Sequence, residues 1–182
     1  MAEATPVQHA LSGVFISYRR SGGWEMARLI HDRLEEKGYE VFLDVEELRS
    51  GPFNTSLFGR IESLTDFVVI LSKDCLGRCR SEGDWLRLEI AHAVRMKKNI
   101  VPVLLRDFEW PQAPLPDDMN ALPFFQGVSA SHEFFDASMD KLAALLIAKP
   151  QRGPRKALWS RILIAAAVVA AVGMAVALYM RH

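Results

Sequence analysis

The sequence lacks several features that identify whole classes of protein. Two cysteines in 182 residues cannot make a disulfide framework, and equal numbers of basic and acidic residues, 22 each, leave no net charge. The chain opens on no apolar segment of the signal-peptide kind, so we expect no secretory leader. No internal repeat or low-complexity tract is present. The hydrophobic content of 50% excludes a disordered chain, and the length suits one ordinary domain with a tail.

The neutral total conceals an uneven distribution of charge. Residues 149–182 contain six Lys and Arg and no acid, which leaves 16 bases against 22 acids in residues 1–148, a net charge of −6. The chain is therefore expected to be an acidic domain joined to a basic, apolar tail. Because nucleic-acid binding depends on basic surface, we expect no nucleic-acid partner for this domain.

The tail contains an uncharged run of 19 residues, from Ile162 to Met180. As a helix rising about 1.5 Å per residue it would span roughly 28 Å, close to the ~30 Å hydrocarbon core of a bilayer. Aromatic and basic residues flank both ends, as they do at membrane interfaces. The sequence predicts a basic linker at 149–161 and a transmembrane helix at 162–180. A buried core helix is the alternative.

The flanking charges predict the orientation of this helix. Five cations precede the run and one follows it, so the amino-terminal domain is expected to face the cytoplasm of a single-pass protein whose partner is the lipid bilayer. Ala167, Ala171 and Ala175 recur at every fourth position. Such a face favours helix association in membranes, although an alanine-rich composition alone also explains it.

Residues 12–148 alternate between short apolar runs and helical patterns, after a leader at 1–11. Such alternation is typical of an α/β fold, here a five-stranded parallel sheet with helices on both faces. Ligands in these folds lie beyond the carboxyl ends of the strands. We expect strands at 14–18, 41–44, 67–72, 100–105 and 125–129, and helices at 22–37, 54–63, 84–96 and 133–147.

Polar residues follow the first two predicted strands. Ser17, Tyr18, Arg19 and Arg20 offer hydroxyls and guanidinium groups to a phosphate-bearing ligand; an ordinary loop in which Ser21 caps the next helix is the alternative. Asp44 ends the second strand, where a carboxylate can accept ribose hydroxyls, or it belongs to a solvated acidic loop.

The helix predicted at 84–96 carries a second carboxylate of interest. Trp85 and Glu89 are four residues apart, on a stripe beside the apolar face, which places Glu89 at the edge of that face near an aromatic ring. Partial desolvation there suits proton transfer or the stabilisation of positive charge. The alternative is a solvated glutamate beside a rim tryptophan.

Motifs for metal or serine-hydrolase chemistry are missing. Cys75 and Cys79 have no Cys/His cluster to complete a zinc site, so we expect no metal and two reduced thiols. The histidines show no triad spacing, and the sequence contains no GxSxG or HExxH.

Four stretches together resemble the Toll/interleukin-1 receptor (TIR) domain in its bacterial form. They are FISYRR at 15–20, VFLD at 41–44, the apolar run at 67–72, and the W-x-x-x-E helix at 85–89 followed by the run at 100–105. The resemblance covers residues 12–148 and departs from the family at 77–84, where the approach to the helix is longer and more charged.

The resemblance implies a flavodoxin-like sheet and an enzyme that cleaves NAD at the nicotinamide–ribose bond, with Glu89 as the catalytic residue. NAD is then a substrate and no cofactor is needed. It implies a substrate pocket formed from residues of the strand ends and the W-x-x-x-E helix. Self-association of the domain is also implied. The residues assigned to substrate binding are Ser17, Tyr18, Arg19, Arg20, Asp44 and Trp85.

Three functions follow from these observations. The first is an NAD-cleaving TIR protein on the bacterial inner membrane, which releases nicotinamide with ADP-ribose or a cyclic product in anti-phage defence. The second is a non-catalytic adaptor that acts through TIR–TIR interaction. The third, a virulence factor that mimics host signalling, fits a membrane-anchored protein less well because the anchor hinders export.

Overall fold

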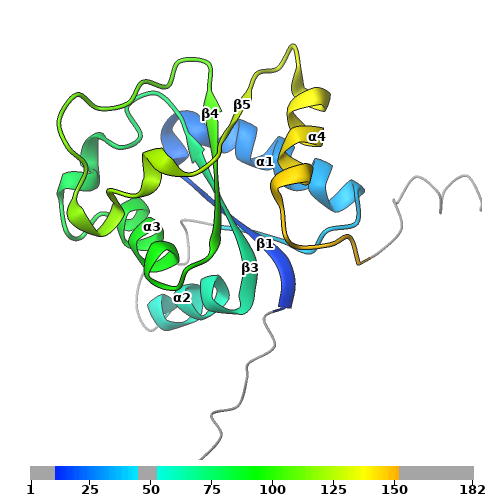
Figure 1. Cartoon of the computed structure of the whole chain (residues 1–182), viewed down its shortest axis with the longest axis horizontal. Helices are drawn as coiled ribbons and strands as arrows, with labels where there is room; N and C mark the ends of the chain where they lie inside the picture. Colours follow the sequence, from blue (N-terminus) through cyan, green and yellow to red (C-terminus); the bar gives the residue numbers. More distant parts are fainter. Residues whose placement is uncertain (1–10, 45–52, 152–182) are drawn as a thin grey trace, which may run out of the picture.

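The computed structural model describes residues 11–44 and 53–151, and its centre is a parallel sheet of five strands (Figure 1). The order β2-β1-β3-β4-β5 is that of flavodoxin-like folds. The predicted five-stranded parallel sheet is therefore confirmed. The strands are β1 (Leu11–Tyr18), β2 (Val41–Leu43), β3 (Leu64–Leu71), β4 (Asn99–Leu105) and β5 (Val128–Ala130).

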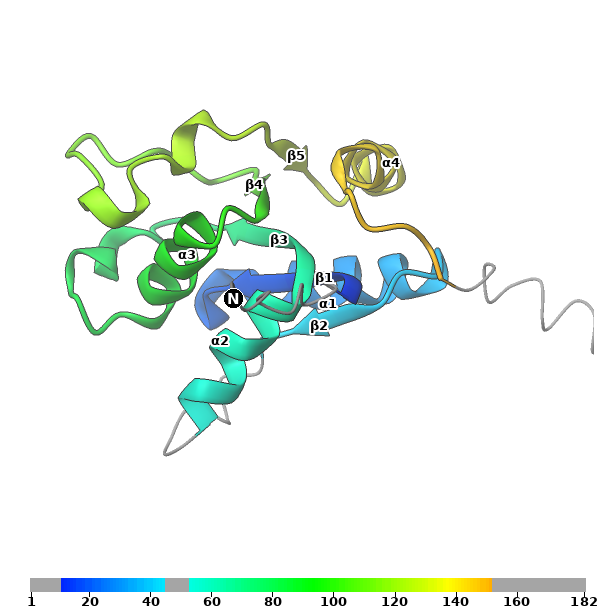
Figure 2. The same ribbon diagram turned by 60° about the horizontal axis from the view of Figure 1, so that its bottom comes forward.

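Helices cover both faces of this sheet (Figures 1 and 2). One face carries α1 (Arg20–Glu36) and α4 (Phe135–Leu145), and the other carries α2 (Phe53–Ser63) and α3 (Trp85–Arg95). Three short 3₁₀ turns complete the described part: η2 (Gly77–Arg80), η3 (Asp117–Met119) and η4 (Leu122–Phe124).

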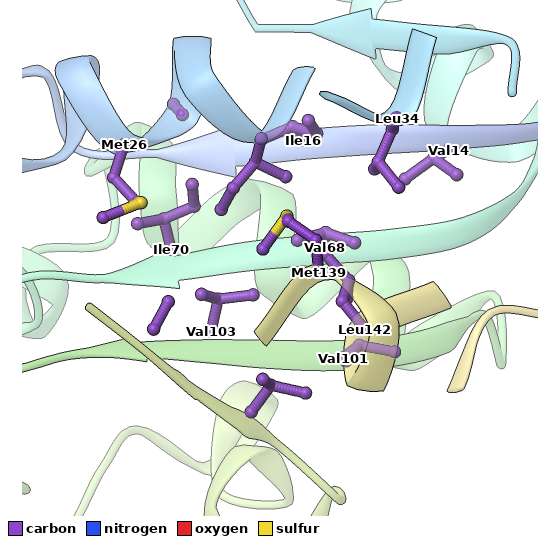
Figure 3. Packing of buried hydrophobic residues seen from close by; sticks show 14 of the residues in the cluster. Val14, Ile16, Met26, Leu34, Val68, Ile70, Val101, Val103, Met139 and Leu142 are labelled. Carbon is purple, nitrogen blue, oxygen red and sulfur yellow. The ribbon is translucent and has the colours of Figure 1, made fainter. Parts of the chain in front are cut away.

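The apolar runs of the central strands form strands that are buried on both faces. Alternate residues of β1 point to opposite sides, so that Val14 and Ile16 join the core under α1 and α4 while Phe15 joins the core under α2 and α3. Figure 3 shows the first core, in which Val68 and Ile70 of β3 lie among the side chains of neighbouring strands and helices. Burial of each such side chain contributes about 1.5–3 kcal/mol.

Two strands begin three residues earlier than the sequence predicts. β1 starts at Leu11, which the prediction assigns to the leader; Ser12 and Gly13 weaken the strand pattern there. A Cβ on Gly13 would lie 2.7 Å from Leu64 Cδ2 and 3.1 Å from the Glu40 carbonyl oxygen, so a larger residue here would crowd both neighbouring segments. β3 starts at Leu64 and includes Asp66, a buried carboxylate that the sequence gives no reason to place in a strand.

The first turn of α1 is irregular. Ser21 has an extended ψ of 111° and Gly22 a positive φ of 80°, so the regular helix runs from Gly23 onward. Arg19 occupies the N-cap position without a side-chain cap, so the alternative in which Ser21 caps this helix is wrong. The Ser72 hydroxyl, just after β3, donates to the Ser21 carbonyl at 3.4 Å and ties this turn to the strand end.

The segment after α4 is bound to the amino-terminal edge of the sheet. Asp66 accepts hydrogen bonds from the backbone N–H groups of Ile147 and Ala148 at 2.9 and 2.7 Å. The Gln151 side chain then donates to the Ser12 carbonyl at 2.7 Å. These bonds fix where the described chain ends, next to the start of β1.

No helix within residues 11–44 and 53–151 has the length and apolar character needed to cross a bilayer. The predicted span at 162–180 lies outside the described residues, as do residues 152–161 of the linker and 1–10 of the leader.

Candidate functional site

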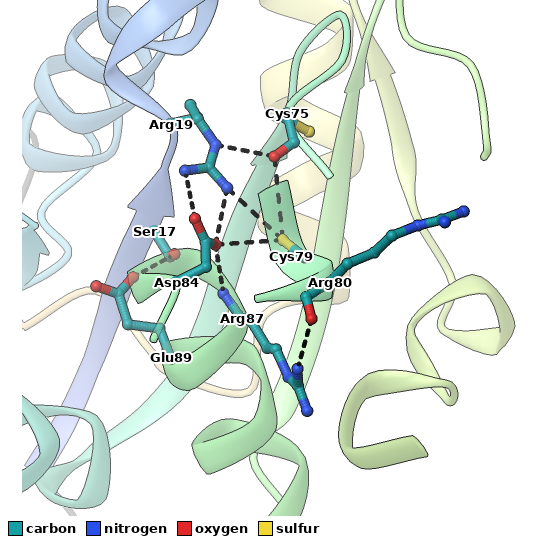
Figure 4. Close-up of polar contacts among 8 residues, drawn as sticks. All are labelled: Ser17, Arg19, Cys75, Cys79, Arg80, Asp84, Arg87 and Glu89. Carbon is teal, nitrogen blue, oxygen red and sulfur yellow. Dashed lines mark hydrogen bonds and ion pairs between the residues drawn. The ribbon is translucent and has the colours of Figure 1, made fainter. Parts of the chain in front are cut away.

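The central pair of the candidate site is Ser17 on β1 and Glu89 on α3 (Figure 4). The Ser17 hydroxyl donates to Glu89 Oε2 at 2.5 Å, a length typical of a hydrogen bond to a carboxylate. Ser17 faces α3 because it lies on the same side of β1 as Phe15. The fold thus joins two predicted site residues that are 72 positions apart.

Glu89 is more deeply placed than the sequence indicates. Its exposed fraction is 0%, and so is that of Ser17, whereas the helical pattern predicts a glutamate at the edge of the apolar face. The alternative of a solvated glutamate is wrong. A carboxylate so far from water depends on fixed hydrogen-bond donors for its stabilisation, and Ser17 is one such donor.

Arg19 forms a two-pronged ion pair with Asp84 at the start of α3 (Figure 4). Its Nη1 and Nη2 donate to the two carboxylate oxygens at 2.9 and 2.8 Å, and its Nε donates to the Cys75 carbonyl at 2.8 Å. Asp84 is also the N-cap of α3, where it accepts from the Arg87 backbone N–H at 3.2 Å. One arginine therefore connects β1, the segment after β3, and α3.

The electrostatics of this cluster keep the ion pair charged. Burial by itself would raise the pKa of Asp84, but the hydrogen bonds from Arg19 and the Arg87 N–H, with the charge of Arg19, hold that pKa below its ordinary value. Burial and the nearby Asp84 carboxylate raise the pKa of Cys79 to about 12, and burial raises the pKa of Cys75 to about 11. Both cysteines are buried free thiols that stay protonated at neutral pH.

Other predicted site residues lie apart from this pair. Tyr18 points to the opposite face of the sheet, where its ring lies 5.9 Å from that of Trp24 on α1. Arg20 is exposed, and Trp85 is half-buried one turn before Glu89. Asp44 follows β2 and is buried, so its placement in a solvated loop is wrong; loop residues 45–52 lie outside the described residues. Which of these residues contact substrate remains a prediction.

Asp84 is the residue of this cluster that the sequence patterns do not assign to the site. Residues 77–84 depart from the family pattern by their length and charge, although an aspartate directly before a helical run is a common N-cap signal. The pairing of Asp84 with Arg19, 65 positions away, has no signature in the sequence.

His92, one turn after Glu89, links α3 to α2. Its Nδ1 lies 2.6 Å from Nη2 of Arg95, and since a guanidinium only donates, Nδ1 is the acceptor and Nε2 carries the proton. Nε2 lies 3.1 Å from Glu62 Oε1 on α2. Burial first, and then the positive charge of Arg95, lower the pKa of His92.

The described residues also form a cleft of about 350 Å³ at the carboxyl ends of β3, β4 and β5. Ser72, Lys73, Arg106 and His132 contribute its polar groups, with Gly22 of α1 at one side. Ser17 and Glu89 do not line this cleft. On α1, His31, Asp32 and Glu35 bring ligand atoms within 4.8 Å of one another, but Asp32 is already bonded to Arg28 and His31.

Comparison with known proteins gives consistent matches over this domain. A family model described as "TIR domain" matches residues 14–143. "NAD(+) hydrolase sarm1" of Drosophila melanogaster is 39% identical over 137 residues, which cover 73% of this chain and 10% of that protein. "NAD(+) hydrolase SARM1" of Danio rerio is 38% identical over 143 residues, which cover 76% and 20%. The chain therefore spans a fifth or less of the length of these relatives.

A solved structure has the same fold. The TIR domains of the activated Roq1 resistosome, which recognises the pathogen effector XopQ, superpose with a TM-score of 0.55 at 15% identity. The match covers 74% of this chain and 98% of that chain.

Proposed function

This chain belongs to the TIR domain family, and from that premise we propose that it cleaves NAD at the bond between nicotinamide and ribose. Two relatives that match about three quarters of the chain are named as NAD(+) hydrolases. The family match includes both Ser17 and Glu89. The observation that carries the proposal is the buried hydrogen bond between these two residues, beside the carboxyl end of β1.

The chemistry requires only one carboxylate. When the C1′–N bond breaks, its electron pair goes to the nicotinamide nitrogen, which neutralises the pyridinium charge, so the leaving group needs no proton. Ordinary glycosidases, in contrast, use two carboxyl groups, one of them an acid. Glu89 stabilises the positive charge that develops on the ribose, and Ser17 holds the carboxylate in a fixed direction.

The products depend on what captures the ribosyl cation. Addition of water to C1′, with release of one proton, gives ADP-ribose. Attack by another atom of the same nucleotide gives a cyclic product instead. We assign Trp85 and Asp44 to the walls of the pocket and Arg20 to the phosphates, on the basis of the family resemblance.

The cellular setting is part of the same proposal. We infer that residues 162–180 anchor the protein in the bacterial inner membrane, with the domain in the cytoplasm, and that it acts there in anti-phage defence. The supporting observations are the uncharged 19-residue run and its basic amino-terminal flank. Confinement to a membrane raises the local concentration of the domain and thereby favours self-association.

The test is nicotinamide release from NAD by the full chain in membranes, beside Glu89→Gln. Glutamine keeps the size of the side chain and an oxygen that accepts from Ser17, so only the charge is lost. Removal of one group that stabilises transition-state charge typically costs about 10²–10³-fold in rate, and we expect at least that loss. Glu36→Gln, an exposed change on α1, is the matched control and should keep full activity.

Equal rates for wild type and Glu89→Gln would refute the catalytic role of Glu89. A wild-type protein that releases no nicotinamide at any protein concentration would favour the adaptor function instead.

A further inference from the structure

We propose that the Arg19–Asp84 ion pair positions Glu89 for catalysis, so that Arg19 acts through Asp84 and not as a phosphate ligand. The proposal rests on the NAD-cleaving function given above. Its starting observation is that two side-chain hydrogen-bonded contacts, Ser17 with Glu89 and Arg19 with Asp84, join β1 to α3 in addition to their apolar packing.

The two contacts follow from the geometry of an extended chain beside a helix. Arg19 has φ −89° and ψ 126°, so it continues the extended backbone of β1 by one residue. Residues 17 and 19 then point to the same side of the strand. They meet residues 89 and 84 of one helix, which are about 7.5 Å apart along its axis at 1.5 Å per residue.

Two contacts at different positions along a helix restrain its direction as well as its position, which a single contact does not do. Leu86, Ile90 and Ala93 pack α3 against the sheet, but apolar packing is non-directional and does not by itself set the orientation of a polar side chain. The Arg19–Asp84 pair holds the amino-terminal end of the helix, and the bond from the Arg87 N–H to Asp84 transmits this constraint to the first turn of α3. Together the two contacts fix the direction in which the Glu89 carboxylate points.

Arg19 has few donors left for a ligand. Its Nε is bonded to the Cys75 carbonyl, and both terminal nitrogens are bonded to Asp84, with Nη2 also 3.6 Å from Cys79 Sγ. The Arg19 and Asp84 side chains are only 9% and 8% exposed. A phosphate at Arg19 would have to displace a buried carboxylate and leave it without its counter-charge.

The experiment compares Asp84→Asn, Arg19→Gln and the double variant in the full chain. Asparagine is also a good N-cap, so Asp84→Asn removes the charge opposite Arg19 and keeps the cap of α3. The matched control is Asp118→Asn, which breaks the 3.0 Å ion pair of Asp118 with Arg87 on the same helix without touching β1. All rates are measured well below the thermal unfolding transition of each variant.

If the ion pair positions Glu89, its removal should lower kcat and leave KM almost unchanged. A displacement of about 1 Å typically costs about 10²-fold, so both single variants should lose roughly 10–100-fold in kcat with KM within about twofold of wild type. Because the two residues act as one unit, the double variant should be no more than about twofold slower than the slower single variant. Asp118→Asn should retain the wild-type kcat.

Two kinetic results would overturn the proposal. A rise in KM confined to Arg19→Gln, with Asp84→Asn near wild type, would make Arg19 a substrate ligand. An unchanged kcat in Asp84→Asn with a lower unfolding temperature would make the pair structural only.

Hydrogen exchange of α3 separates failure of this proposal from failure of the proposed function. If the wild type does not cleave NAD, the proposed function fails, but the exchange still tests the pair. The first-turn amides of α3 should exchange faster in Asp84→Asn and not in Asp118→Asn. Unchanged exchange in Asp84→Asn would show that the pair does not hold the helix.

Discussion

Replacement of Ser17 by alanine tests how the protein maintains a carboxylate away from water. The change removes one hydroxyl, which donates to Glu89 Oε2 at 2.5 Å. Both residues have an exposed fraction of 0%, so bulk water cannot replace the lost donor. A hydrogen bond to a charged group is worth about 1.5–3 kcal/mol, and the free energy of unfolding should fall by that amount.

The assay is thermal unfolding of the full chain, followed by near-ultraviolet circular dichroism. A loss of this size in a domain of this length lowers the midpoint by roughly 5–10 °C. The control is Ser63→Ala, which removes an exposed hydroxyl bonded to the Arg60 carbonyl and should change stability by less than about 0.5 kcal/mol.

The same variant should also lose activity, because the carboxylate is no longer held in one direction. We expect kcat for NAD cleavage to fall by about 10–100-fold, as for other losses of alignment. A Ser17→Ala protein as stable and as active as the Ser63→Ala control would refute the reasoning that this hydrogen bond supports Glu89.

Three further predictions concern other parts of the domain. The pKa of His92 is lowered from 6.5, so at acidic pH the unfolded chain binds a proton that the folded chain excludes, and the free energy of unfolding should fall as the pH drops below about 6.5. Unfolding measured between about pH 7.5 and 5.5 should show this decrease, and His92→Phe should make it smaller. Cys75 and Cys79, whose pKa values are raised to about 11 and 12, should react with a thiol reagent at pH 7.5 only at the rate of unfolding, and fast labelling of the native protein would contradict their burial. Gly13→Ala should cost about 1–3 kcal/mol in thermal unfolding because its Cβ would meet Leu64, whereas Gly59→Ala, which has open space, should cost nothing by crowding.

The sequence was sufficient to predict the layers of the fold but not how its ends are fixed. The apolar runs at 67–72 and 100–105 predict the two central strands because a strand covered on both faces needs apolar residues at every position. Asp66 breaks that rule, and β3 therefore begins three residues before the predicted start. Its carboxylate is stabilised by N–H groups about 80 residues later, which no local pattern reveals.

The same limit applies to the candidate site. The W-x-x-x-E spacing places Glu89 beside the apolar face, since residues four apart share a side of a helix, and the family resemblance assigns it the catalytic role. Its complete burial depends on how α3 is set against β1, and the helical pattern alone places it at an edge. The sequence places Tyr18 and Arg19 side by side as candidate ligand-binding residues, yet strand alternation directs their side chains to opposite faces of the sheet.

The binding of residues 147–151 to the start of the sheet gives the domain two distinct poles. The last described residue, Gln151, is bonded to Ser12, next to where β1 begins, so both covalent connections of the domain lie at one pole. Ser17 and Glu89 lie toward the other pole, near the carboxyl end of β1. A tag, a fused domain or a solid support attached through either connection is therefore held away from Glu89. The pole that contains Ser17 and Glu89 then stays open to solution.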